Sequence, residues 1–375
     1  MTFIQENQVT PNISVIVPLY NRFSLLKPVV ESILAQTLPV TEIIIIDDGS
    51  TEHTPATVER HIRKTPAWRE RVRYYYQQNQ GQSVANNVGI GMAKGEWLAF
   101  NAHDDVWLPQ KLEWQFRALE KSGREYGLCF TDAWFVNNPH MKMTLFQHYG
   151  KDFTTTLGTV PEPARLIVSE SVVWLQTVIA RADLVHRVGG LDPKLRYCED
   201  HDFLFRMALV TKFCYVGMPM VLIDRSPAEV RHIGEGRNWH KEEYCLQMGQ
   251  YRFEKQLNLA QDLPVDVRKA IRKNLRSIHS AWTNWYLANA QYEKARESVS
   301  VAARYDLTPN IALKWLLTRG APKLATKILS MRDRNAVRYD RVSWQLDEQH
   351  PSMTKKPEIE NDEIQQQKSL HQPQS

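Results

Sequence analysis

The sequence predicts an α/β fold, in which a mostly parallel sheet is flanked by helices, with an all-α appendage at the C-terminal end. Over roughly the first hundred residues, short apolar segments alternate with amphipathic ones. This β-α-β-α-β-α-β order is typical of a parallel sheet with right-handed crossovers. From about residue 252 the pattern changes, and apolar residues recur at helical spacing.

The individual elements follow from these patterns. Between the first two expected strands, apolar residues from Leu25 to Leu34 fall on one face of a helix. The segment 131–170 is the least regular part, and the apolar run Ser171–Ile179 is expected to resume the sheet. The four strands expected in the first half are Ile13–Tyr20, Glu42–Asp48, Val72–Tyr76 and Trp97–Phe100.

Two of these strands end in adjacent carboxylates. Asp47 and Asp48 close the second strand, and Asp104 and Asp105 follow the fourth. Open α/β sheets bind ligands beyond the carboxyl ends of their strands, and hard divalent cations favour oxygen ligands together with substrate phosphates. Taken alone, the second pair could be an acidic strand-to-helix turn. Two pairs at one edge favour a ligand-binding crevice.

The order and spacing of these motifs resemble the family 2 glycosyltransferases over roughly residues 11 to 235. The resemblance implies the GT-A fold, inverting transfer from a nucleotide-sugar donor, Mg²⁺ or Mn²⁺ as cofactor, and an aspartate as catalytic base. The segments that carry it are Val15–Asn21, Ile45–Thr51, Gln80–Ile90, Gly95–Phe100, Asp104–Pro109, Gly189–Asp192 and Glu199–Arg206.

The resemblance also implies which residues bind the donor. Pro18 and Tyr20 match the end of the first strand, which lies against the nucleotide base. Asp47 and Asp48 match an acidic pair of which one member typically contacts the base or the ribose. Asn86 stands where many members carry an arginine, so a positive charge near the donor is missing.

For the chemistry, the resemblance implies three further roles. Asp104 matches the metal ligand, and Asp200 matches the general base, with Asp202 as its near competitor and Arg206 able to pair with these carboxylates. His232 resembles a late histidine that in some members reaches the metal or the diphosphate. Without the resemblance, the acids would be read as a helix start and His232 as a loop residue.

One departure from the family pattern motivates an alternative function. Ala102 replaces the first aspartate of the Asp-X-Asp motif, whose middle position is His103. The alternative is a non-catalytic protein that binds nucleotide sugar or glycan and assembles partners through its helical end. A nucleotidyltransferase would need a Gly-rich basic loop after the first strand, and a dinucleotide dehydrogenase would need G-x-G-x-x-G there; Pro18–Arg22 is neither.

Composition indicates a protein without a membrane span. Hydrophobic residues make up 43% and the mean hydropathy is −0.45. The longest apolar run, Ile43–Ile46, is far short of the ~20 residues that a spanning helix needs. The N-terminus lacks the pattern of a signal peptide, and the four cysteines lack C-x-x-C spacing. We expect a cytoplasmic protein, with a possible peripheral place at the inner face of the membrane.

The chain is expected to divide into four parts. Residues 252–345 contain 18 Lys and Arg against 8 Asp and Glu, whereas the whole chain has a net charge of only +5. The predicted parts are an N-terminal arm (1–10), a glycosyltransferase domain (11–240, with a donor-binding half at about 11–110 and an acceptor half at 111–240), a basic helical region (241–345) and a disordered tail (346–375).

One helix of the basic region carries cations opposite its apolar face. A solvated helix surface would explain them, and so would contact with an anionic membrane, a lipid-linked acceptor or an acidic glycan. Nucleic acid is not expected, because no recognised binding motif accompanies the charge. The cations, all expected to face solvent, are Arg268, Lys269, Arg272, Lys273 and Arg276.

Overall fold

The computed structural model describes residues 11–52, 54–138, 141–151, 153, 155–225 and 242–333. The chain divides into two units, residues 1–335 and 336–375, and every described residue belongs to the first. The predicted N-terminal arm (1–10), His232 and the predicted disordered tail (346–375) lie outside the described residues.

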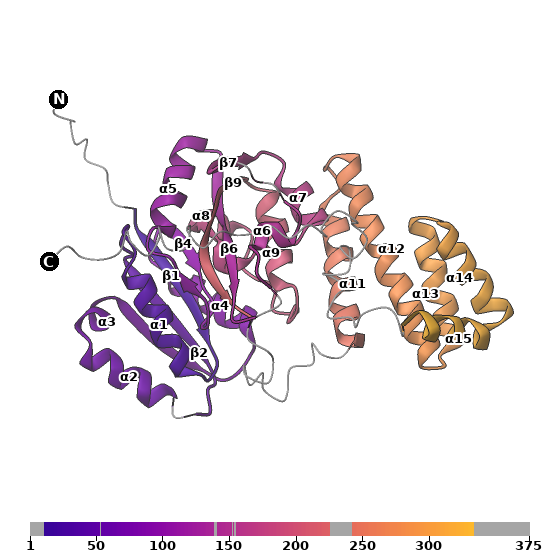
Figure 1. Cartoon of the computed structure of the whole chain (residues 1–375), viewed down its shortest axis with the longest axis horizontal. Coiled ribbons are helices and arrows are strands. Elements are labelled where there is room, and N and C mark those ends of the chain that lie inside the picture. The colour runs from indigo at the N-terminus through magenta and orange to yellow at the C-terminus, as the bar shows by residue number, and fades with distance from the viewer. Residues whose placement is uncertain are drawn as a thin grey trace. The chain divides into compact units, whose positions relative to one another are not determined.

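Within the described residues, nine strands form one sheet in the order β3-β2-β1-β4-β8-β6-β9-β5, with β7 paired to β9 (Figure 1). The strands are β1 (Ile13–Leu19), β2 (Glu42–Asp48), β3 (Val72–Gln77), β4 (Trp97–Phe100), β5 (Val106–Trp107), β6 (Tyr126–Val136), β7 (Leu157–Val160), β8 (Ile179–Arg181) and β9 (Lys212–Asp224).

Helices connect the strands and continue beyond them. Those that accompany the sheet are α1 (Phe23–Leu34), α2 (Thr54–Lys64), α3 (Pro66–Arg71), α4 (Gln82–Met92), α5 (Lys111–Ser122), α6 (Leu145–His148), α7 (Pro163–Ser169), the 3₁₀ turn η1 (Leu175–Thr177), α8 (Ala182–Arg187) and α9 (Glu199–Ala208). Those that follow are α11 (Glu242–Leu259), α12 (Val265–Ala288), α13 (Tyr292–Tyr305), α14 (Pro309–Gly320) and α15 (Pro322–Asp333).

The N-terminal half of the sheet is parallel, as predicted: β1 pairs with β2 and with β4, and β2 pairs with β3. Strand β2 buries side chains on both faces. Ile44 and Ile46 pack with Ala85 of α4, whereas Ile43 and Ile45 belong to the main core. A strand covered on both faces reads as a continuous apolar run, which explains the four consecutive isoleucines.

The second half of the sheet is mixed. Strand β8 lies antiparallel between β4 and β6, while β6 and β9 are parallel. The predicted strand Ser171–Ile179 is wrong over most of its length, since only Ile179 belongs to β8. Side chains, rather than a neighbouring strand, donate hydrogen bonds to backbone carbonyls of this segment. Gln115 of α5 donates to the carbonyl of Thr177, and the Trp174 indole donates to the carbonyl of Ser171.

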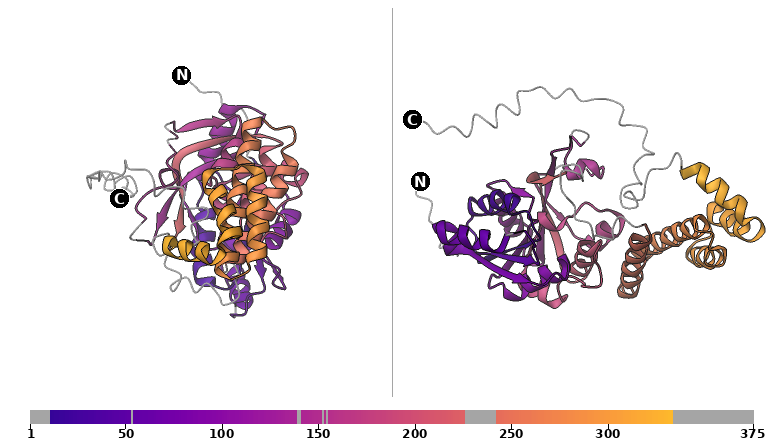
Figure 2. Two further views of the ribbon diagram at one scale, coloured as in Figure 1. Left: turned by 90° about the vertical axis from the view of Figure 1, so that its right-hand side faces the viewer. Right: turned by 90° about the horizontal axis from the view of Figure 1, so that it is seen from below.

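From Glu242 onward, the described chain forms helices joined by short turns; each helix packs on the next, and α15 also returns to α12 (Figure 2). Helix α12 also contacts the sheet domain, because Asn274 donates to the carbonyl of Val168 in α7. The expectation that all five cations of α12 face solvent is wrong for Arg276, which is mostly buried and paired with Asp306. No helix of the described part is long and apolar enough to cross a bilayer.

Candidate functional site

Two residues tie the loop after β1 to the loop after β2. Asn21 has φ 60°, in the left-handed region that asparagine tolerates better than most residues. Its backbone N–H donates to Oγ of Ser50 at 2.6 Å, and its side-chain oxygen accepts from the N–H of Thr51 at 2.9 Å. Pro18 lies in β1 and Tyr20 stands half-buried just before this turn. These two hydrogen bonds hold the carboxyl ends of β1 and β2 side by side.

The acidic pair at the end of β2 braces the surrounding loops. Asp47 is fully buried and accepts a hydrogen bond from the hydroxyl of Tyr74 at 2.6 Å. Asp48 accepts from the N–H groups of Gln80 and Gly81, each at 2.8 Å, and so holds the turn that leads into α4. The side-chain amide of Gln77 also donates to Asp48 at 2.8 Å, and both carboxylates are buried, so in this structure they brace the loops.

The second acidic pair follows β4 on the other side of β1. Phe100, the last residue of β4, is level with Ile16 of β1 and Ile44 of β2, so β4 ends four residues short of Asp48, and Asp104 follows Phe100 by four residues. Asp105 is buried and accepts from the N–H of Asp224 at 3.1 Å. Burial, and then the charge of Asp104, raises the pKa of the Asp105 carboxyl well above its ordinary value. Asp104 is half-buried, and the structure gives its side chain no hydrogen bond to another described residue.

The predicted catalytic base stands in the first turn of α9. Cys198, with φ 57°, turns the chain into this helix, and Asp200 follows two residues later. Asp200 is half-buried, and one of its oxygens accepts from the N–H of His201 at 2.8 Å. Burial lowers the pKa of the His201 imidazole to about 4, so the ring is neutral at pH 7. The Asp200 carboxylate thus stands at a helix N-terminus, where the dipole favours it.

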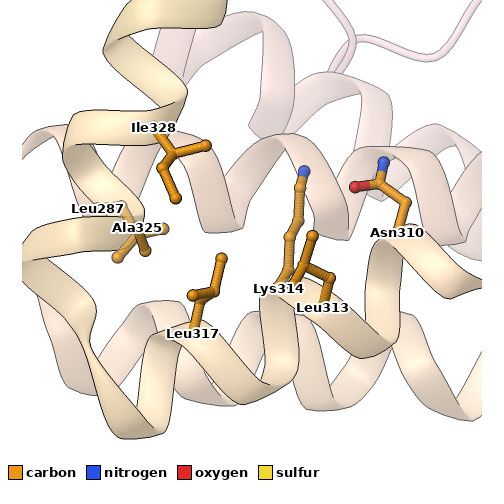
Figure 3. Close-up of a pocket in the computed structure, with 7 residues that line it drawn as sticks. All are labelled: Leu287, Asn310, Leu313, Lys314, Leu317, Ala325 and Ile328. Atoms are coloured by element: carbon orange, nitrogen blue, oxygen red, sulfur yellow. The ribbon is translucent and has the colours of Figure 1, made fainter.

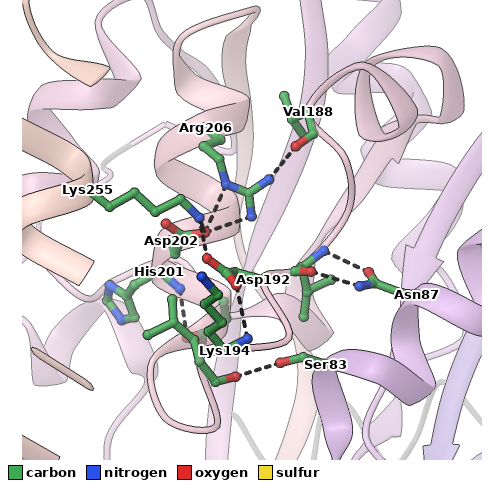
Figure 4. Close-up of polar contacts among 12 residues, drawn as sticks. Ser83, Asn87, Val188, Asp192, Lys194, His201, Asp202, Arg206 and Lys255 are labelled. Carbon is green, nitrogen blue, oxygen red and sulfur yellow. Dashed lines mark hydrogen bonds and ion pairs between the residues drawn. The ribbon is translucent and has the colours of Figure 1, made fainter. Parts of the chain in front are cut away.

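Asp202, the competitor for the base, is enclosed by cations (Figure 4). It is fully buried, and its Oδ2 accepts from Nζ of Lys255 at 2.9 Å and from Nε of Arg206 at 2.8 Å. Lys255 comes from α11 and also donates to Asp192 at 2.7 Å, so one ammonium bridges two carboxylates. Asp202 is thus enclosed by its cationic partners, whereas Asp200 is half-buried.

Side chains of α4 hold the loop that precedes α9 (Figure 4). The amide of Asn87 exchanges two hydrogen bonds with the backbone of Leu191, at 2.7 and 2.8 Å. Ser83 donates to the carbonyl of Leu195 at 2.7 Å. Asn86, expected to bind the donor, is buried, and its amide N–H donates within α4. The neighbouring Asn87 therefore provides the observed link between the two halves of the site.

Arg225 directly follows β9 and lies over aromatic rings. The guanidinium of Arg225 stands 4.4 Å from the ring centroid of Trp174. Burial raises the pKa of the Tyr149 phenol to about 12; the charge of Asp200 raises it as well, whereas Arg225 lowers it. The charge of Arg225 partly offsets the rise in the pKa of the Asp105 carboxyl, which burial dominates. The charge of Arg225 thus acts on both Asp105 and Tyr149.

The described donor set suits a divalent cation that is held largely by its substrate. Of the two predicted metal ligands, Asp104 is described, whereas His232 lies among residues 226–241, which are not. In the described part of the chain, no three His, Cys, Asp or Glu side chains form a group that could hold a metal. Magnesium is commonly bound by one or two carboxylates plus substrate phosphates, and half-buried Asp104 beside Asp105 fits that arrangement.

Sequence reasoning missed four residues of this site. Asn21 and Asn87 lie inside motifs that carried the family resemblance. Asparagine amides in such motifs commonly hydrogen-bond backbone groups, and this signal could have identified both residues. Arg225 and Lys255 lie far along the chain from the groups they approach, and no local spacing marks them.

Comparisons with known proteins agree with the geometry. The family model for glycosyl transferase family 2 matches residues 14–169. An uncharacterized glycosyltransferase of Rickettsia typhi is 26% identical over 211 residues, which cover 56% of this chain and 62% of that protein. One of Rickettsia conorii is 35% identical over 195 residues, covering 52% of this chain and 31% of that protein. The chain thus spans less than two thirds of the length of these relatives.

A solved structure shows the same fold. The crystal structure of residues 1–349 of S. aureus TarS superposes with a TM-score of 0.59 at 17% identity, covering 88% of this chain and 93% of that one. The match extends over the sheet and into the helices that follow residue 240, because it covers most of the described residues. Together with the family model and the named relatives, it shows that the chain carries a family 2 glycosyltransferase domain with the GT-A fold.

Proposed function

We propose that this protein is an inverting glycosyltransferase that moves a hexosyl group from a nucleotide-sugar donor to a hydroxyl of a glycan or lipid-linked acceptor, with Mg²⁺ or Mn²⁺, in cell-surface polysaccharide biosynthesis. S. aureus TarS 1–349 has been crystallised with UDP-GlcNAc, and that structure superposes on this chain with a TM-score of 0.52. The shared fold supports a nucleotide-sugar donor for this chain too. We further propose that the protein is cytoplasmic and binds peripherally at the inner face of the membrane.

The contrast between Asp200 and Asp202 carries the mechanism. Asp202 is enclosed by Lys255 and Arg206, whereas Asp200 is half-buried and reachable. We assign to Asp200 the removal of the proton from the acceptor hydroxyl while the hydroxyl oxygen attacks the anomeric carbon opposite the leaving diphosphate. A positioned base of this kind contributes typically 10²–10⁴-fold, and direct displacement inverts the anomeric centre.

The residues at the sheet edge act on the leaving group. Asp47 and Asp48 fix the loops against which the nucleoside lies, together with Pro18 and Tyr20. A divalent cation bound by Asp104 would neutralise charge on the departing diphosphate. His232 is a proposed second ligand.

A panel of UDP-, GDP-, dTDP- and CMP-sugars with and without Mn²⁺ first identifies the donor by thermal shift. A ligand that binds only the folded protein stabilises it by about 2.7 kcal/mol at a hundredfold excess over Kd. Release of nucleoside diphosphate by slow donor hydrolysis then reports catalysis without a known acceptor.

Asp200→Asn should bind the donor with unchanged affinity but lower hydrolysis by about 10²-fold or more. Asp202→Asn should instead lower the urea midpoint of unfolding. If Asp200→Asn retains full hydrolysis, the base is misassigned. If the native protein binds donor but never releases product, the non-catalytic alternative suggested by Ala102 is correct.

A further inference from the structure

Helices α14 and α15 present a surface of exposed leucines and cations. Leu313 and Leu316 of α14 and Leu324 of α15 have exposed fractions of 50%, 61% and 50%. Large apolar side chains exposed to this degree are unusual in a group and mark interaction sites. We name this the α14–α15 surface, and its members are Leu313, Leu316, Arg319, Lys323, Leu324 and Lys327.

The apolar residues continue into a pocket between the two helices (Figure 3). Leu317 and Leu313 of α14 and Ile328 of α15 line it, with Leu287 of α12 and Ala325 at its base. Leu287 and Ala325 are buried and form a small core with neighbouring side chains, which holds α15 against α12. The exposed leucines therefore stand on a packed scaffold.

The charge of this region has one sign. Between Asp306 and Asp333 the sequence contains five Lys and Arg and no Asp or Glu. Lys314 is buried and donates to Ser280 and Asn284, so it supports α14 from within. Arg319, Lys323 and Lys327 are exposed. Two copies of such a surface would repel each other, which disfavours self-association through it.

Helix α12, the basic helix predicted from the sequence, is a weaker candidate for an interaction surface than the α14–α15 surface. Arg276 is paired with Asp306, and Arg268 is half-buried. Lys269, Arg272 and Lys273 remain exposed. The apolar residues of α12 between these cations, such as Ile271, are buried. Among the described side chains of α12, Val265 at the N-terminal end is the one large apolar side chain that is strongly exposed, whereas the α14–α15 surface has three exposed leucines beside its cations.

We infer that the α14–α15 surface binds an anionic lipid surface. Interfacial helices combine Leu or Trp on one side with Lys and Arg that remain at the level of the headgroups. Leu316 and Leu324 enter the headgroup boundary, while Lys323 and Lys327 contact lipid phosphates, and each cation contributes through the negative surface potential. The contact is peripheral and depends on salt.

Flotation of the full chain with vesicles tests this inference. The vesicles are phosphatidylcholine alone or phosphatidylcholine with phosphatidylglycerol. We expect binding to the anionic vesicles at low salt and release as salt rises. Lys323→Gln with Lys327→Gln should lower partitioning about 25-fold, because each cation near an anionic surface contributes about fivefold. Leu316→Ser with Leu324→Ser should lower it as well.

The matched control is Arg272→Gln with Lys273→Gln, which removes the same charge from α12. We expect it to lower partitioning less than the α15 pair does. All of these side chains are exposed, so circular dichroism and the unfolding midpoint should be unchanged. Equal losses from both pairs, or no effect of the leucine substitutions, would overturn the inference. Absence of binding at low salt would also overturn it and would point to an acidic protein as the partner.

Discussion

Lys255→Met would remove the ammonium that links α11 to the helix of the proposed base. Lys255 donates to Asp202 at 2.9 Å and to Asp192 at 2.7 Å, and Asp202 is completely buried. Loss of one partner from a buried ion pair destabilises a protein by about 3–5 kcal/mol. Arg206 would remain on Asp202, and Lys255 itself is 24% exposed, so we expect about 2–3 kcal/mol.

Urea unfolding followed by circular dichroism measures this change. Lys255→Arg keeps the charge and should recover part of the lost stability. Lys269→Met, which removes an exposed lysine from α12, is the matched control and should leave the midpoint within error. If Lys255→Met unfolds at the same urea concentration as Lys269→Met, the bridge does not stabilise α9 and the reasoning fails.

The substitution should also alter catalysis. Asp200 lies two residues before Asp202 on α9, so a loosened helix presents the base less accurately. We expect the rate of donor hydrolysis to fall about 10- to 100-fold, with little change in donor affinity. Because burial by itself raises the pKa of Asp192 while Lys255 and other donors lower it below its ordinary value, the native protein gains stability above pH 4 that the variant should lack.

Three further changes test other parts of the site. Asp104→Ala should abolish the increase in donor affinity that Mn²⁺ gives, and calorimetry with and without EDTA measures it; equal affinity in both conditions for the native protein would contradict the metal assignment. Asn87→Leu should destabilise the fold by about 2 kcal/mol in urea unfolding, because it leaves two backbone groups of Leu191 unpaired. Burial lowers the pKa of Lys111 to about 7, below its unfolded value of about 10.4, so the unfolded state binds more protons above pH 7. The stability of the native protein should therefore rise between pH 7 and 8, by at most about 1.4 kcal/mol, and Lys111→Met should not show this rise.

The parallel half of the fold could be predicted because its signals are local. The four isoleucines of β2 predict a strand covered on both faces, and the acids that follow mark its carboxyl end. The segment Ser171–Val178 looks equally apolar but is not a strand. It contains a 3₁₀ turn, and the carbonyl of Thr177 accepts a hydrogen bond from Gln115 of the distant helix α5 instead of from a neighbouring strand. Such a contact depends on tertiary packing and leaves no periodic trace in the sequence.

The residues of the candidate site, like the strands, could be predicted only in part from local signals. Asp104 and Asp200 were predicted from motifs, and their roles stay predictions until they are tested. The family resemblance favoured Asp200 over Asp202 as the base, although two acids at one helix start look alike in the sequence itself. Their burial distinguishes them, and that burial depends on Lys255, more than fifty residues further along the chain.

The contacts of α11 bear on where the catalytic unit ends. The composition of the chain suggested a boundary near residue 240, before α11 begins. Yet Lys255 and Tyr251 of α11 both bond to Asp192, and Lys255 also neutralises Asp202, so two carboxylates beside the proposed base depend on side chains beyond that boundary. A buried carboxylate without its cations is strongly destabilising. The side chains of α11 therefore stabilise the helix that carries the proposed base, and α11 belongs energetically with the sheet domain rather than with a separate helical region.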